Sequence, residues 1–150
     1  TSILKNLAPH LPASKPHFLM GVGKPEDIIE GVFYGIDMFD CVLPTRNARN
    51  GQLFTSYGVL NIRNAPSKMK DESIDPNCEC KVCKNYSQAY LNHLDKTNEM
   101  LGSILNSFHN LYYYQSLMKD IRYSIENDTF AKFIKDFYNK RHLEVPKHLI

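Results

Sequence analysis

Cys78-Glu79-Cys80-Lys81-Val82-Cys83 places three of the four cysteines of this chain within six residues. Zn²⁺ prefers a tetrahedron of sulfur and nitrogen ligands, and thiolates this close in sequence can turn toward one ion. Three unrelated cysteines, or a disulfide with a spare thiol, are the alternatives, but the gathering of three thiols in one short stretch favours a metal. The stretch therefore predicts a zinc site.

A fourth ligand must come from elsewhere in the chain, and two downstream histidines are candidates. His93 follows Cys83 by ten residues and His109 follows it by twenty-six. Spacing leaves both open, because either segment can fold back onto the cysteines. Four protein ligands leave no open position for water or substrate, so the predicted zinc is structural. The other histidines are predicted to be surface or capping residues: His10, His17, His142 and His148.

Length and composition indicate one folded domain. The chain has 150 residues, of which 43% are hydrophobic, and it contains no low-complexity run. Its net charge of +2 is too small to indicate nucleic-acid binding by itself. No apolar run approaches the roughly 20 residues that span a bilayer, and no leader is visible. We therefore expect a cytoplasmic protein without membrane association, and the start at Thr1 suggests a processed or excised piece.

The first third of the chain predicts a strand–helix–strand unit. Residues 17–22 and 36–42 are short and mostly apolar, as buried strands are. Between them, from Pro25 to Tyr34, the apolar residues fall on one face of a helix, which Gly35 ends. Strands joined in this way pair in parallel, and ligands meet the loops at their carboxyl ends. This singles out the loops at residues 20–24 and 40–50.

The remaining segments predict a hairpin followed by helices. Two short apolar runs flank a turn at residues 56–58, which is typical of a β-hairpin. A polar loop at residues 64–77 leads into the cysteines. Helical spacing then predicts three helices, at about residues 87–95, 101–125 and 129–140.

The loop Gly21-Val22-Gly23-Lys24 suggests a phosphate-binding motif but does not fit one. A P-loop needs Ser or Thr after the lysine, where Pro25 stands, and a dinucleotide fingerprint needs a third glycine where Glu26 stands. What remains is a loop with few side chains, through which backbone amides can approach a flat ligand. Taken alone, the pattern favours a plain strand-to-helix turn.

Asp40 ends the second predicted strand and is followed by a segment with two arginines. A carboxylate here can act as nucleophile, base or metal ligand, although spacing alone favours a bond to backbone amides of the following turn. In the predicted loop 43–51, Arg46 and Arg49 offer donors for phosphate oxygens and base edges. A solvated turn explains the same residues. Cys41 and the run Tyr112–Tyr114 are predicted to pack without a chemical role.

Four stretches acquire a further meaning when they are taken together and in order. They are Met20-Gly21-Val22-Gly23-Lys24-Pro25, Gly35-Ile36-Asp37-Met38-Phe39-Asp40-Cys41-Val42, Pro44-Thr45-Arg46-Asn47-Ala48-Arg49-Asn50-Gly51 and the Cys78–Cys83 cluster. They closely resemble the bacterial tRNA-guanine transglycosylases, also called queuine tRNA-ribosyltransferases. The resemblance runs from about residue 17 to about residue 141. It includes Asn106-Ser107-Phe108-His109-Asn110-Leu111, and it implies that His109 is the fourth zinc ligand.

The resemblance implies an α/β fold that is the C-terminal part of a (β/α)₈ TIM barrel. Residues 1–63 would supply barrel units and the hairpin, residues 64–110 a zinc-binding subdomain, and residues 111–150 the C-terminal helices. The implied enzyme exchanges the wobble guanine in the anticodon loop of tRNA for a 7-deazaguanine precursor of queuosine.

The resemblance also assigns roles to individual residues. Asp40 matches the nucleophile, which attacks C1′ of the ribose as guanine leaves and so forms a covalent RNA–enzyme intermediate. Met20 and Gly21 match positions that contact the nucleobase. Lys24, Arg46 and Arg49 match positions that lie close to the bound tRNA in the family.

The chain departs from the family in length. A complete enzyme is more than twice as long, and a (β/α)₈ barrel takes about 250 residues. The aspartate for proton transfer and most of the base-recognition pocket lie upstream in the family. We therefore expect the chain to be inactive alone and to associate with itself, as a homodimer, or with the missing half. The alternatives are a non-catalytic zinc-containing module for tRNA binding or assembly, and an inert fragment.

Overall fold

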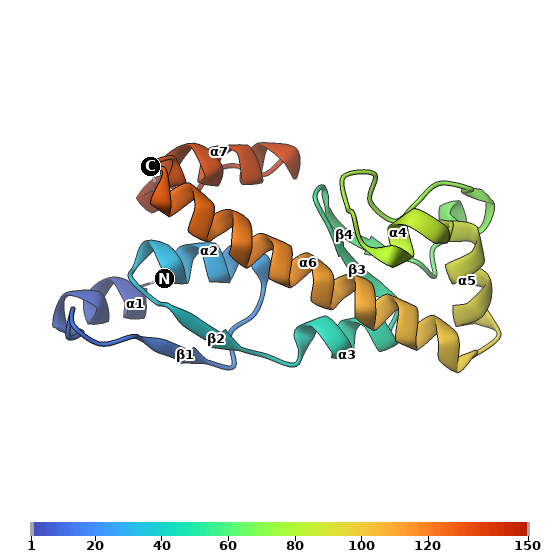
Figure 1. Cartoon of the computed structure of the whole chain (residues 1–150), viewed down its shortest axis with the longest axis horizontal. Helices are drawn as coiled ribbons and strands as arrows, with labels where there is room; N and C mark the ends of the chain where they lie inside the picture. Colours follow the sequence, from blue (N-terminus) through green and yellow to red (C-terminus); the bar gives the residue numbers. More distant parts are fainter. Residues whose placement is uncertain (1, 150) are drawn as a thin grey trace.

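The long helix α6 (Met100–Glu126) organises the fold. The computed structural model describes residues 2–149, and in it α6 runs diagonally through the molecule with the other elements packed along it (Figure 1). One end of α6 lies beside the strand–helix–strand unit, and the other lies beside the hairpin and the cysteine cluster. Its buried positions recur every three or four residues, as the sequence spacing predicts. They include Gly102, Asn106, His109, Tyr114, Leu117 and Ile121.

The predicted strand–helix–strand unit is confirmed. Strand β1 (Phe18–Met20) and strand β2 (Met38–Asp40) pair in parallel, and helix α2 (Pro25–Phe33) connects them. Helix α2 ends at Phe33 and is capped by Tyr34, and the next residue, Gly35, has a φ of 85°, in the left-handed region that favours glycine. A short helix α1 (Ser2–Leu7) and a 3₁₀ turn η1 (Ala8–His10) precede the unit.

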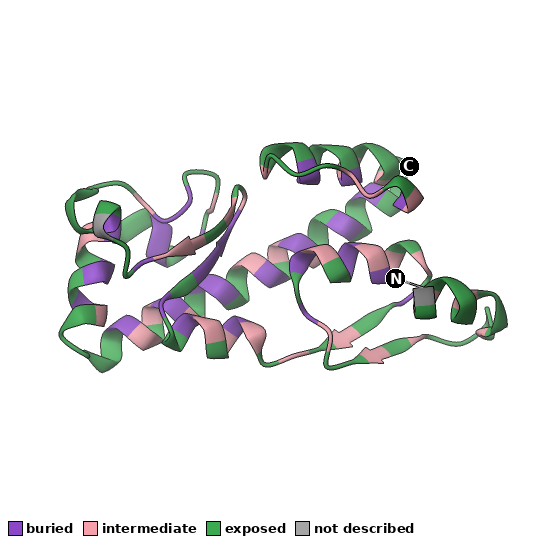
Figure 2. Cartoon of the chain, turned by 180° about the vertical axis from the view of Figure 1, so that it is seen from behind, coloured by how far each residue is buried: buried purple, intermediate pink, exposed green. Residues whose placement is uncertain are grey.

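This two-stranded sheet is covered on only one face. Phe39 points toward α2, where its ring lies so close to Gly31 that a Cβ on that glycine would come within 2.7 Å of it. The opposite face lies open, and neither strand contains a fully buried residue (Figure 2). Its exposed side chains are Phe18, Met20, Met38 and Asp40.

The prediction of a loop at residues 43–51 is wrong, because residues 43–49 form helix α3 (Leu43–Arg49). Pro44 lies in the first turn, where its fixed φ suits a helix and its missing N–H is not needed. Ala48 is fully buried against the rest of the fold. The polar residues of this segment made it resemble a loop, whereas the proline and the buried alanine determine the helix.

The hairpin and the cysteine region form the other end of the molecule. Strand β3 (Gln52–Thr55) pairs antiparallel with strand β4 (Gly58–Asn61), which confirms the predicted hairpin. The segment predicted as a loop contains a 3₁₀ turn η2 (Ala65–Met69), and the unpredicted helix α4 (Lys81–Asn85) carries Cys83. Helix α5 (Gln88–Lys96) begins where the Ser87 hydroxyl accepts a hydrogen bond from the amide of Tyr90.

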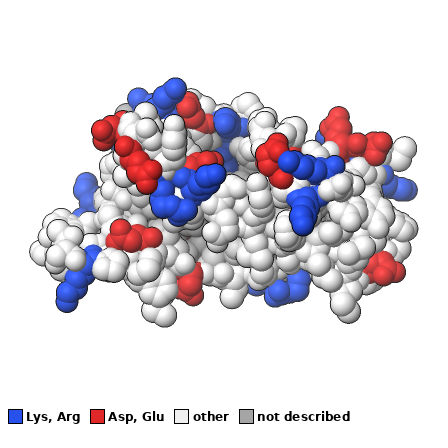
Figure 3. All heavy atoms as spheres, in the orientation of Figure 1, with Lys and Arg blue, Asp and Glu red and all other residues white. Residues whose placement is uncertain are grey.

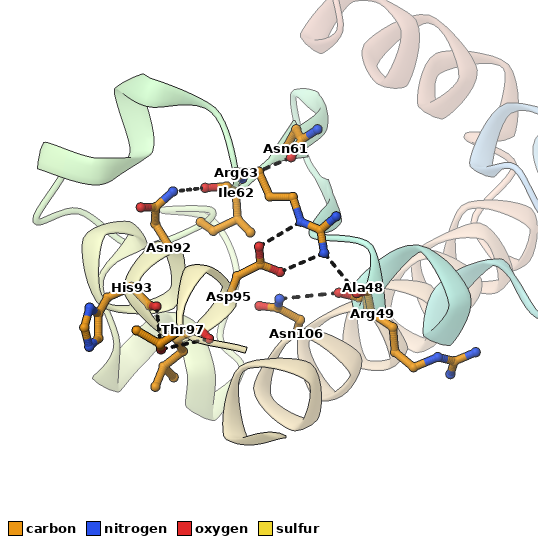
Figure 4. A network of polar contacts seen from close by, with 11 residues as sticks. Ala48, Arg49, Asn61, Ile62, Arg63, Asn92, His93, Asp95, Thr97 and Asn106 are labelled. Atoms are coloured by element: carbon orange, nitrogen blue, oxygen red, sulfur yellow. Dashed lines mark hydrogen bonds and ion pairs between the residues drawn. The ribbon is translucent and has the colours of Figure 1, made fainter. Parts of the chain in front are cut away.

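An ion pair joins three of these elements. The Arg63 guanidinium, just after β4, donates to both carboxylate oxygens of Asp95 on α5, at 2.7 and 3.2 Å (Figure 4). The same group donates to the carbonyl of Arg49 at the end of α3. Asn92 adds a buried bond from its side-chain amide to the carbonyl of Ile62. These contacts fix α5 against the hairpin.

Two hydrophobic clusters lie along α6. One contains residues of α2, α6 and the last helix, α7 (Phe130–Lys140), and includes Ile29, Leu117, Ile121 and Phe137. The other joins the hairpin, α4 and α5 through residues such as Leu53 and Leu91. A final 3₁₀ turn η3 spans Lys147–Leu149. No helix within residues 2–149 has the length and apolar character needed to cross a membrane.

Arg141 bridges the end of α7, the hairpin and α6. Its side chain is only 4% exposed, and its guanidinium lies 3.5 Å from the centre of the Phe137 ring. It donates to the carbonyl of Thr55 at 3.0 Å and to the hydroxyl of Tyr113. These bonds connect the C-terminal helix to the turn of the hairpin.

Replacing Ile121 by alanine tests the role of α6 in the first cluster. Ile121 is 1% exposed, so Ile121→Ala should lower the free energy of unfolding by about 2–5 kcal/mol. Ile3 on α1 is 76% exposed, and Ile3→Ala should change it by no more than about 0.5 kcal/mol. Urea titration followed by circular dichroism measures both, and equal effects would contradict the assignment of the core.

Candidate metal centre and strand-end carboxylate

Three cysteines and one histidine converge on a single point. Cys78 lies in the loop before α4, Cys80 caps that helix, Cys83 lies within it, and His109 comes from α6. Their ligand atoms all lie within 4.8 Å of one another. The three sulfur atoms are 3.8, 3.5 and 3.4 Å from Nδ1 of His109, in the order of the sequence.

These distances fit a tetrahedral zinc site. Zn–S bonds of about 2.3 Å and Zn–N bonds of about 2.0–2.1 Å place sulfur and nitrogen roughly 3.5–3.6 Å apart. His93 lies exposed on α5 and takes no part in the cluster, so the structure resolves the choice that spacing left open. The donor set of three thiolates and one imidazole is one that structural zinc sites use.

His109 is held so that Nδ1 points at the sulfur atoms. The residue is fully buried, and its Nε2 lies 2.8 Å from the carbonyl of Phe54 on β3, a distance at which Nε2–H donates to that oxygen. A proton on Nε2 leaves the lone pair of Nδ1 free for a metal. The second nitrogen of the ring thereby attaches the cluster to the hairpin.

The electrostatics of the cluster favour a cation. Hydrogen bonds from Cys78 and Cys83 lower the pKa of Cys80, so a thiolate forms there readily. Burial alone would lower the pKa of His109, but hydrogen bonds to Cys78 and Cys80 raise it to about 9. Hydrogen bonds to Cys78 and Cys80, together with burial, raise the pKa of Cys83 in turn, so one sulfur of the cluster ionises most readily. A cation among the three sulfur atoms would favour the thiolate form of the others as well.

The backbone supports the thiolates. The amide of Cys83 donates to Sγ of Cys80 at 3.3 Å, which is the usual N-cap bond with sulfur in place of oxygen. Asp75, buried in the preceding loop, accepts from the amide and the hydroxyl of Ser56 at 2.6 and 2.8 Å. This pair ties the cysteine loop to the turn of the hairpin.

Asp40 lies at the carboxyl end of β2, opposite Met20 at the end of β1. Its Oδ1 accepts a hydrogen bond of 3.1 Å from the amide of Gly21. The carboxylate does accept a bond from a backbone amide, but the donor belongs to the loop after the neighbouring strand and not to the turn that follows Asp40, as spacing alone favoured. Gly21 has a φ of 71°, which few other residues adopt, so the chain turns sharply at the residue whose amide binds the carboxylate.

Lys24, Arg46 and Arg49 are all exposed and lie on segments that begin at the two strand ends. Lys24 immediately precedes α2, and the arginines project from α3, where Arg49 points away from the ion-pair network in Figure 4. On the face seen in Figure 3, basic side chains are interspersed with acidic ones. Any affinity for nucleic acid must therefore depend on these local groups, as the net charge also indicates.

Sequence reasoning missed the side chains of α6 that bind the backbone of other elements. Asn110 is fully buried, and its side-chain oxygen accepts from the amide of Phe54 at 3.0 Å. Its side-chain amide donates to the carbonyls of Pro44 and Gln52 at 2.9 and 3.0 Å. The detectable signal was a polar residue at a core position of an amphipathic helix.

Comparison with known proteins identifies the family. Residues 1–143 match the family model described as queuine tRNA-ribosyltransferase. The chain is 59% identical over 145 residues to the queuine tRNA-ribosyltransferase of Shewanella sp. (strain ANA-3), an alignment covering 97% of this chain and 39% of that protein. The proteins of the same name from Photobacterium profundum and Vibrio vulnificus (strain YJ016) are 60% and 58% identical over 144 residues, which cover 96% of this chain and 38% of each relative.

The chain thus spans about two fifths of the length of the curated relatives it matches. Nearly its whole length takes part in these matches, and the cysteine–histidine cluster lies inside the matched region. By sequence, the chain belongs to the queuine tRNA-ribosyltransferase family.

Proposed function

We propose that this chain is the C-terminal part of a tRNA-guanine transglycosylase, a pentosyltransferase that exchanges the wobble guanine of tRNA for a 7-deazaguanine. The observation that carries the proposal is the position of Asp40. The chain belongs to this family, and Asp40 lies at the carboxyl end of a parallel strand. Enzymes built on barrels of such strands place their reactive groups there. The Asp40 side chain is exposed on the open face of the sheet.

Asp40 acts as the nucleophile in this proposal. Its carboxylate attacks C1′ of the ribose, the bond from C1′ to guanine breaks, and an ester links the enzyme to the RNA. The incoming base then attacks C1′ and releases the carboxylate, so the ribose configuration is retained. The Gly21 amide orients Oδ1, whereas Oδ2 makes no hydrogen bond with the residues that the structure describes.

The neighbouring residues bind the two substrates. Met20 is 74% exposed on the same face as Asp40, where its side chain can lie against a flat nucleobase. Gly21 offers its backbone groups to the same base. Lys24, Arg46 and Arg49 bind phosphates of the anticodon loop. C1′ becomes accessible only when the nucleotide is splayed out of that loop.

The Cys78, Cys80, Cys83 and His109 cluster binds one structural Zn²⁺ per chain. The metal supplies no chemistry to the exchange, because four protein ligands complete its coordination. Its ligands join the loop before α4 to α6, and the second nitrogen of His109 joins both to β3. The zinc thereby braces the end of the fold that supports α3.

The upstream part of the enzyme covers the open face and edges of the β1–β2 sheet. In a (β/α)₈ barrel the helices lie outside and the strands face a packed interior, and α2 lies on only one face of this sheet. In the complete enzyme, the barrel units come from residues 1–63, the zinc subdomain from residues 64–110, and the C-terminal helices from residues 111–150. Exposed apolar residues on α6, among them Ile104 and Phe108, support pairing of two copies as a homodimer.

We place the enzyme in the cytoplasm, because none of the four cysteines, all within the described residues, forms a disulfide, and this suits a reducing compartment. The non-catalytic alternative, a zinc-containing tRNA-binding or assembly module, predicts that these residues bind tRNA without any base exchange. The experiments below separate it from the enzyme.

Replacing Asp40 by asparagine in the complete enzyme tests the nucleophile. Asp40→Asn should abolish both guanine exchange and the covalent tRNA adduct seen on a denaturing gel, because the amide oxygen is a poor nucleophile. Asp37→Asn is the matched control, since Asp37 accepts a bond from the His17 amide and lies outside the strand pair. An adduct that survives in Asp40→Asn would reject the assignment.

Replacing His109 or His93, the two histidines that spacing left open as ligands, tests the metal site. Elemental analysis of the wild type should give about one zinc per chain, and His109→Ala should reduce it to near zero after dialysis against a mild chelator. His93→Ala should keep the full metal content, because His93 is exposed and lies outside the cluster of ligands. Equal zinc content in the two variants would contradict the proposed ligand set.

Salt titration of tRNA binding tests the basic residues. Arg46→Ala and Arg49→Ala should each weaken tRNA binding and reduce the slope of log affinity against log salt by about 0.7, the value for one single-strand phosphate contact. Arg122→Ala removes an exposed arginine of α6, which is not on either segment that follows β1 or β2, and should leave the slope unchanged. A slope that responds equally to all three substitutions would show a diffuse interaction instead.

A further inference from the structure

Three side chains on one face of α6 bind backbone carbonyls of α3 and of the loop that follows β1. Asn106, Asn110 and Tyr114 follow one another at intervals of four residues, so they line one side of the helix. They donate to the carbonyls of Ala48 at 3.4 Å, Pro44 at 2.9 Å and Gly23 at 2.5 Å. Figure 4 shows the first of these contacts, from Asn106 to the end of α3.

The Tyr114 contact reaches the loop that follows β1. Its hydroxyl donates to the Gly23 carbonyl, and both residues are buried. Burial raises the pKa of the Tyr114 hydroxyl, so this group remains protonated and acts as a donor at neutral pH. The contact spans 91 positions of the sequence and links α6 directly to this loop.

The same loop is pressed against the residue that follows Asp40. A Cβ on Gly23 would lie only 1.8 Å from Sγ of Cys41, so the backbone of the loop is in direct contact with the end of β2. The loop is therefore held between Cys41 on one side and the Tyr114 hydroxyl on the other. Two residues earlier in this loop, the Gly21 amide binds the Asp40 carboxylate.

The hydroxyl of Tyr114 is separable from the packing of its ring. The ring meets Phe54 edge-to-face with 5.1 Å between centroids and belongs to the first hydrophobic cluster. A phenylalanine at this position keeps these contacts and loses only the bond to Gly23. The role of the hydroxyl can thus be tested without removing the core residue.

We propose that Tyr114 is a positioning residue, whose hydroxyl fixes the Gly21–Lys24 loop and thereby aligns both the Asp40 carboxylate and the incoming base. This inference rests on the proposed function, because it names the group that holds the loop in place beside the Asp40 carboxylate. Tyr114 lies five residues after His109 on the same helix, so the zinc cluster and the loop are braced by one rigid element. Tyr114 does not touch the reacting atoms.

The test compares Tyr114→Phe with Tyr113→Phe in the complete enzyme. Both changes remove one phenolic hydroxyl with a buried hydrogen bond, but the Tyr113 hydroxyl binds Arg141 and not the loop. Tyr114→Phe should raise KM for the incoming base and lower kcat/KM by about two- to tenfold, the range for one lost hydrogen bond. KM for tRNA and zinc content should stay unchanged, and Tyr113→Phe should leave all these constants at wild-type values.

A second readout does not depend on activity. Hydrogen–deuterium exchange followed by mass spectrometry reports the protection of the peptide that covers residues 18–25. Tyr114→Phe should speed its exchange, whereas Tyr113→Phe should not, even when the two variants have the same melting temperature. Equal exchange in the two variants, or equal losses of kcat/KM, would overturn the proposal.

The two readouts also separate this inference from the proposed function. If the wild-type enzyme exchanges no guanine, the proposed function fails, and the deuterium exchange of the loop still decides whether Tyr114 holds it. If the wild type is active and Tyr114→Phe behaves as Tyr113→Phe does, the proposed function stands and the positioning role of Tyr114 is rejected.

Discussion

The whole arrangement depends on one imidazole ring that uses both of its nitrogens. Nδ1 of His109 faces three sulfur atoms, and Nε2 lies at hydrogen-bond distance from the Phe54 carbonyl. A buried ring with an unpaired nitrogen would be costly, so each contact secures the other. Through this residue the cysteine loop, the hairpin and α6 become one unit, although its contacts span up to 55 positions of the sequence.

Helix α6 carries this constraint to the rest of the molecule. Its buried face combines apolar residues, such as Leu117 and Ile121, with the polar side chains of Asn106, Asn110 and Tyr114. The apolar residues supply non-directional stabilisation, whereas the polar ones specify position, because a hydrogen bond is lost when its partner shifts by an ångström. The helix therefore sets both the stability of the fold and the register of the loops around Asp40.

Features that depend on neighbouring residues were predictable from the sequence. Apolar spacing and glycine signals placed α2, α5, α6, α7, the parallel strand pair and the hairpin. The helical state of residues 43–49 was not predicted, because its polar residues obscured the signal of Pro44. Spacing could not choose between His93 and His109, and it could not reveal the bond from Tyr114 to Gly23, since both depend on contacts between segments far apart in the chain. The barrel remains a prediction, because it requires strands that this chain does not contain.

The open face of the β1–β2 sheet bears on how reactive Asp40 is. On this chain the carboxylate is exposed, so water stabilises its charge, and the proposed attack on carbon requires that this water be displaced. The apolar side chains beside it, Met20 and Met38, are also exposed, and within the described residues no other segment packs against them. In the proposed reaction, this chain would supply the attacking oxygen and its orientation, whereas the loss of hydration that makes this oxygen a strong nucleophile would come from whatever covers that face.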